Sequence, residues 1–197
     1  SFKGYGLFFN GLKNLDESIA KHLASYKGHS LSFRGVETLH EDSAKYLASF
    51  TGNSLQLDGL KHLESSTAGQ LATFRGPVLS LNGVSILDAE TAKQLGGFKG
   101  DKLFLDGVLA LDALTAKQLA TFKGQRLFLS GITNLDANTA EQLVTFQGVF
   151  PHLRGVVDID VNTAEKLATF GGDSLSLMGL KHIDISIAEK LVGFKGK

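Results

Sequence analysis

Glycine recurs along the whole chain at one fixed spacing of 24 residues, with no repeat longer or shorter. The eight positions are Gly11, Gly35, Gly59, Gly83, Gly107, Gly131, Gly155 and Gly179. A unit of this length cannot bury its own apolar face, so units with a strict period stack on one another as a solenoid. We therefore predict a single domain over 1–197. It consists of a tail at 1–6 and repeats at 7–30, 31–54, 55–78, 79–102, 103–126, 127–150, 151–174 and 175–197.

The first half of each repeat has the pattern of a short strand. In the fourth repeat, Leu79 and Leu81 alternate with Ser80 and Asn82. This alternation of apolar and polar residues is typical of a strand with one buried face. Strands of successive repeats would then pair in parallel and form a sheet on one face of the solenoid.

The second half of each repeat has the pattern of a short helix. Ala92, Leu95 and Phe98 are spaced by three residues, which places them on one helical face. Asp88 is a suitable N-cap, and Gly100 has the position of a left-handed residue that ends a helix. Five further aspartates share the column of Asp88: Asp16, Asp112, Asp136, Asp160 and Asp184. We therefore predict an α/β repeat solenoid of eight strand-plus-helix units.

Two other architectures fit the columns less well. A helix–helix solenoid would bury Gly83 and its equivalents inside helices, at about 1 kcal/mol each relative to alanine. An all-strand β-helix would leave the helix caps and the amphipathic pattern without a role.

The pattern Leu-x-Leu-x-Gly-Leu followed by a capped short helix resembles a leucine-rich repeat, in particular the divergent arrays of bacterial proteins. The resemblance covers the whole chain. It implies binding of a protein or other ligand on the strand face, and it suggests an extracellular or cell-surface location. Common leucine-rich repeats carry Asn or Cys soon after the strand, where the side chain bonds the neighbouring loop. Here a glycine column lies near that point, so we expect no such ladder.

Composition narrows the function classes. The chain has 20 basic and 20 acidic residues and no cysteine. A formal net charge of zero argues against wrapping nucleic acid or an anionic membrane. No apolar run approaches the roughly 20 residues that span a bilayer.

One part of the strand face departs from small and polar residues. Repeats five to seven place aromatic and basic residues at the positions between the inward-facing leucines. These are Lys102, Phe104, Arg126, Phe128, Phe150 and His152. Arginine and large aromatic residues anchor protein interfaces, so we predict a contiguous binding patch here. The alternative is structural, with Phe104 and Phe128 pairing across neighbouring strands under the cover of the two basic side chains.

Pro151 replaces a strand leucine in the seventh repeat. Proline has no N–H to donate to a sheet, so we expect a local bend or weakened pairing there.

No catalytic constellation breaks the repeat symmetry. The histidines lack the spacing of metal ligands, and the sequence contains no phosphate-binding or dinucleotide-binding glycine motif. We therefore expect a non-enzymatic scaffold without cofactor or metal that binds a protein or glycan partner. The alternative is a structural subunit of a filament or cell-surface layer, assembled through uncapped solenoid ends. Both ends of the chain fall at the same point in the repeat, so we also expect it to be a window of a longer array.

Overall fold

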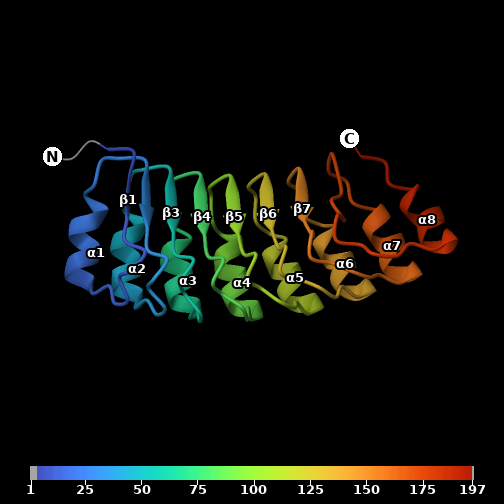
Figure 1. The fold of residues 1–197 in the computed structure, drawn as a ribbon. Coiled ribbons are helices and arrows are strands. Elements are labelled where there is room, and N and C mark those ends of the chain that lie inside the picture. The colour runs from blue at the N-terminus through green and yellow to red at the C-terminus, as the bar shows by residue number, and fades with distance from the viewer. Residues whose placement is uncertain (1–3, 197) are drawn as a thin grey trace.

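The computed structural model describes residues 4–196, and of Phe150 the backbone only. Figure 1 shows strands and helices in two rows that run from the N-terminus to the C-terminus. The strands are β1 (Gly6–Phe8), β2 (Ser30–Ser32), β3 (Ser54–Gln56), β4 (Val78–Ser80), β5 (Lys102–Phe104), β6 (Arg126–Phe128) and β7 (Phe150–His152). The helices are α1 (Glu17–Ala24), α2 (Glu41–Ala48), α3 (Ser65–Leu71), α4 (Ala89–Gly96), α5 (Ala113–Leu119), α6 (Ala137–Leu143), α7 (Val161–Ala168) and α8 (Ile185–Leu191).

The strands in this part of the chain form one seven-stranded parallel sheet in sequence order. Each strand residue pairs with the residue 24 positions later, as Leu79 does with Leu103. The α/β repeat solenoid with a parallel sheet on one face is therefore confirmed. The row of helices fans out more widely than the row of strands, so the solenoid curves with its strands on the inner side (Figure 1).

The core is a set of columns between the sheet and the helices. In the fourth repeat, Leu79 and Leu81 of the strand half and Ala92, Leu95 and Phe98 of the helix half have no exposed surface. The phenyl rings of consecutive repeats stack in parallel along the solenoid, with centroids 5.9 to 6.4 Å apart from Phe50 to Phe146. Each repeat is thus covered by the two beside it, which is why one repeat alone cannot hold this core.

The helices begin where the sequence predicted. The side chain of Asp88 accepts a hydrogen bond from the Thr91 N–H at 2.7 Å, which satisfies a helix donor that has no partner within the helix. The five aspartates of the same column cap their helices in the same way. In repeats two and three the cap positions are His40 and Glu64, and neither side chain makes this bond.

The prediction for the end of the helix was wrong. Helix α4 ends at Gly96, and the capping residue Gly97 is right-handed, so Gly100 lies beyond the helix. No glycine among residues 4–196 has a positive φ. A Cβ at Gly100 would lie 2.7 Å from the Gly76 carbonyl oxygen and against the ring of Phe98. Glycine is therefore required here by close approach of the neighbouring repeat and not by backbone handedness.

The glycine column that follows the strands has the same cause. A Cβ at Gly83 would press on the carbonyl oxygen of Asp58 and lie 2.6 Å from that of Leu60, both in the preceding repeat. The chain passes so close to its neighbour that no side chain fits between them.

A short side-chain ladder follows the strands, contrary to our expectation that none would. The Asp58 carboxylate accepts the Asn82 N–H (3.1 Å), and the Asn82 amide oxygen accepts the Asp106 N–H (2.9 Å). The Asp106 carboxylate in turn accepts the Ser130 N–H at 2.8 Å. Aspartate and asparagine both offer a short-range oxygen acceptor, so this mixed column satisfies the loop donors without a strict asparagine repeat.

Pro151 weakens strand pairing only on the side of β7 that faces repeat eight. Strand β7 keeps full register with β6, but beyond it His152 makes a single bridge to Ser176. The Leu129 N–H donates to the His152 carbonyl oxygen (3.0 Å). Donors alternate along a parallel strand, so the position two residues before Leu129 also faces the next repeat. Pro151 is the equivalent of that position in repeat seven, which explains the loss toward repeat eight.

Candidate binding surface on the strand face

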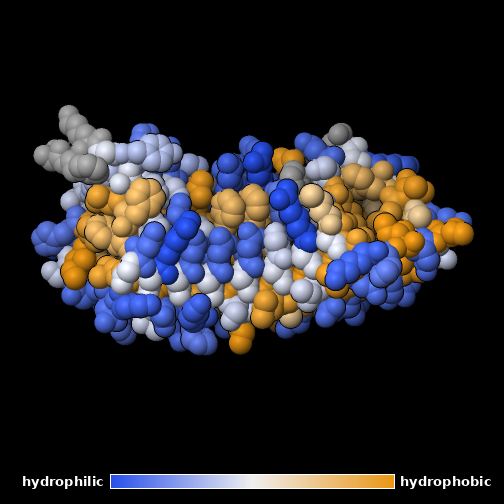
Figure 2. Space-filling view, in the orientation of Figure 1, coloured by the Kyte–Doolittle hydropathy of each residue, from blue (hydrophilic) through white to orange (hydrophobic). Residues whose placement is uncertain are grey.

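The strand face carries mostly small and polar side chains, and several of them are shaded by their neighbours. Ser32 and Ser80 point to this face and are nevertheless buried, whereas Phe8 at the N-terminal end is 58% exposed. In Figure 2 an apolar area lies over β5 and β6 within a mainly hydrophilic strip, between larger apolar areas at the two ends of the solenoid. The area over β5 and β6 is the candidate binding surface.

Three rings form a continuous stack in this area, which we call the ring stack: Phe104, Phe128 and His152. The strands bring these residues side by side in register. The ring centroids of Phe104 and Phe128 are 4.0 Å apart with an angle of 7° between the ring planes. Those of Phe128 and His152 are 4.1 Å apart at 12°. Parallel pairing of strands 24 residues apart in sequence is what builds this column.

His152 is the most buried member of the ring stack. It is only 6% exposed, although the sequence predicted an exposed position. Burial lowers the pKa of His152 from 6.5 to about 4, and the positive charges of Arg154 and Arg126 act in the same direction. The imidazole is therefore neutral at physiological pH and stacks as an uncharged ring.

Basic residues flank the ring stack on both sides. Lys102 and Arg126 pair in register on β5 and β6, two residues before the rings. Arg126 is exposed and Lys102 is half-buried. Arg154, two residues after His152, is exposed on the other side. Asp106 is the acidic residue of this neighbourhood, and one oxygen of its carboxylate is occupied by the Ser130 N–H.

The structure thus brings five of the six predicted site residues together, with Phe104 and Phe128 both half-buried. Phe150 begins β7 opposite Arg126, but its side chain lies outside the described part of the structure. The predicted ring pairing of the structural alternative is present as well, because the rings contact one another along the sheet. Pairing uses the faces of the rings and leaves their edges at the surface.

Sequence reasoning did not place Arg154 and Asp106 in the site. Both belong to the column two residues after the rings, in which consecutive members are 24 residues apart. The column is too varied in charge to stand out in one sequence. Once strand register is known, it is the row that borders the ring stack.

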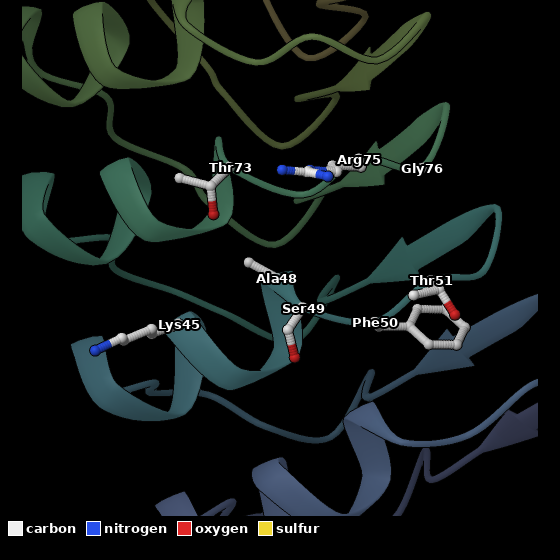
Figure 3. A pocket seen from close by; sticks show the side chains of 8 residues that line it. All are labelled: Lys45, Ala48, Ser49, Phe50, Thr51, Thr73, Arg75 and Gly76. Carbon is white, nitrogen blue, oxygen red and sulfur yellow. The ribbon is translucent and has the colours of Figure 1, made fainter.

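A groove of about 550 Å³ lies between the second and third repeats. Its polar groups do not converge, since the nitrogen ends of Lys45 and Arg75 lie well apart in Figure 3. The hydroxyls of Ser49 and Thr73 donate to the carbonyl oxygens of Tyr46 and Gln70 (2.6 and 2.7 Å) and so complete helix ends. These two hydroxyls of the groove are therefore engaged with the helix backbone.

A second groove, lined by Asp136, Asp158 and Asp160 among others, is acidic. Its carboxylates are occupied by backbone donors: Asp136 and Asp160 cap helices, and Asp158 accepts the Ile159 N–H at 3.0 Å. Within residues 4–196 no group of three or more His, Asp or Glu side chains has the arrangement of a metal site. The helices of the same segment are all too short or too polar to cross a membrane.

Comparison of the sequence with protein-family models and with curated proteins finds no match. What the structure itself establishes is a repeat protein of strand-plus-helix units around one parallel sheet.

Proposed function

We propose that this protein is a non-enzymatic scaffold of the leucine-rich-repeat kind that binds a protein partner through its strand face, with the ring stack and its flanking cations as the contact. The observation that carries the proposal is the position of Phe104 and Phe128. They are half-buried apolar side chains on a face where the equivalent residues of other repeats include Ser32, Gln56 and Ser80.

Two physical arguments support a contact at this place. Aromatic and arginine side chains are enriched at protein interfaces, where a few residues contribute most of the binding energy. The ring stack is also rigid before any partner arrives, because each ring is held by its neighbour and by the strand beneath. A surface ordered in advance avoids part of the entropic cost of association.

The test is selection of peptides from a random display library on the immobilised protein, followed by binding to the variant Phe128→Ser. We expect selected peptides to lose binding to this variant. The matched control is Phe8→Ser, the same substitution in the same column of repeat one, which should retain binding. Removing one stacked ring costs about 1–2 kcal/mol, so the melting temperature should fall by only a few degrees. A large fall would show that Phe128 belongs to the core and would contradict the proposal.

Assembly through the solenoid ends is the second prediction from the sequence, and the same variants distinguish it. Association that grows with protein concentration and that Phe128→Ser leaves unchanged would favour end-to-end assembly over binding at the strand face.

A further inference from the structure

We infer that the ring stack selects an acidic peptide segment, which places its carboxylates along the ring edges between Arg126 and Arg154, and that it does not act as a platform for sugar rings. This inference rests on the proposed binding function and names the chemistry of its partner.

The orientation of the rings is the first argument. Rings 4.0 and 4.1 Å apart that lie within 12° of parallel turn their faces toward one another along the solenoid axis. Phe128 has a ring on each side, so both of its faces are covered. The half-buried surface that Phe128 retains is therefore largely its edge, whereas Phe104 has one face against Phe128 and pairs with Ser80 on its other side. An aromatic edge carries positive partial charge, while the face carries negative charge.

The flanking charges have the same sign as these edges. Lys102 and Arg126 lie on one side of the rings and Arg154 lies on the other. The carboxylate of Asp106 is held by the backbone of the next repeat and opposes only part of this charge. Besides burial, Arg154 and Arg126 lower the pKa of His152 and Asp106 raises it, so charges on both sides of the rings act on the ring stack. Three cationic side chains and one carboxylate thus border the ring stack, although the protein as a whole has no net charge.

The same geometry argues against a sugar ligand. A sugar ring packs its C–H groups on an aromatic face, where the quadrupole is negative. In this stack neighbouring rings occupy both faces of Phe128 and one face of Phe104. Carboxylates, in contrast, bind arginine through two parallel hydrogen bonds and are attracted by ring edges. An extended acidic peptide supplies several carboxylates at short intervals and can reach both rims.

The experiment compares synthetic peptides of one sequence in three forms: with Glu and Asp, with Gln and Asn, and with Lys at the charged positions. Each carries one phenylalanine, and neutral and uronic-acid oligosaccharides are measured in parallel. Binding is measured by fluorescence anisotropy and calorimetry at about 0.01 M and about 0.15 M salt, because contacts between exposed charges are screened over this range. The variants are Arg126→Glu and, as control, Lys117→Glu on the exposed side of α5, which makes the same change in net charge.

We expect the acidic peptide to bind most tightly, with a dissociation constant that rises about tenfold or more in Arg126→Glu and at higher salt and is unchanged in Lys117→Glu. Equal binding of acidic and neutral peptides that is still lost in Phe128→Ser would overturn this inference and leave the proposed function intact. Preference for an oligosaccharide that is lost in the same variant would also overturn it. Binding of every probe at the same strength to the native protein and to all patch variants would overturn both.

Discussion

Replacing Gly83 by alanine is the sharpest test of how the repeats are held together. The added Cβ would lie 2.6 Å from the Leu60 carbonyl oxygen and would press harder still on that of Asp58. Both oxygens belong to the backbone of the preceding repeat, so they cannot move aside as a flexible side chain would. Relief requires the third and fourth repeats to separate locally. Overpacking of this kind costs about 1–3 kcal/mol, and because the obstacle is backbone we expect the upper part of that range.

Gly69→Ala is the matched control, and its expected effect on stability has the opposite sign. Gly69 lies inside α3, and its added Cβ would meet only the flexible end of Gln94, at 3.2 Å. Alanine restricts the unfolded chain and favours a helix, so this variant should be more stable by about 0.5–1 kcal/mol.

Urea denaturation followed by far-UV circular dichroism measures both variants, and amide exchange in repeats three and four locates the effect. In Gly83→Ala we expect the amides of repeats three and four to lose exchange protection while those of the other repeats keep it. The reason is that a linear array can open locally between two neighbouring repeats. If Gly83→Ala were as stable as the native protein, the close approach of the repeats would be excluded as the reason for the glycine column.

The remaining predictions concern the core and the buried histidine. Leu95→Ala should lower the free energy of unfolding by roughly 2–5 kcal/mol, because the side chain is fully buried; unchanged stability in urea denaturation would contradict its place in the core. His152 has a folded pKa of about 4 against 6.5 when exposed, so the unfolded state takes up the proton first and stability is lost as the pH falls from 6.5 toward 4. The full shift corresponds to roughly 3 kcal/mol, which we reduce to about 1–2 kcal/mol for screening by solvent near the surface. Urea titrations from pH 7 to about pH 4 should show this loss in the native protein and less of it in His152→Phe; equal losses in the two would assign the pH dependence to other groups.

The features that the sequence predicted correctly depend on contacts within one repeat or on its period. Asp88 caps its own helix through a residue three positions away, so its role can be read locally. The alternation at Leu79 and Leu81, repeated at a constant step, implies parallel strands in register because no other pairing keeps every leucine inside.

The features that the sequence did not predict depend on distances between repeats. A glycine such as Gly100 is equally compatible with a left-handed turn and with close packing, and only the neighbouring backbone distinguishes them. The burial of His152 follows from the ring stacked on it, and the ladder through Asn82 follows from the turn of the loop. Neither can be read from residue types alone.

The constant step between repeats has a consequence for how this gene can change. Consecutive helices make the main contacts, and consecutive strands pair at the same register throughout. Recombination that removes or duplicates a segment of one whole period rejoins surfaces that already match, wherever the breakpoint falls. A shift by one residue would instead turn every leucine beyond the junction to the wrong face. The array can therefore lengthen or shorten in whole units while the ring stack stays on the same side of the sheet.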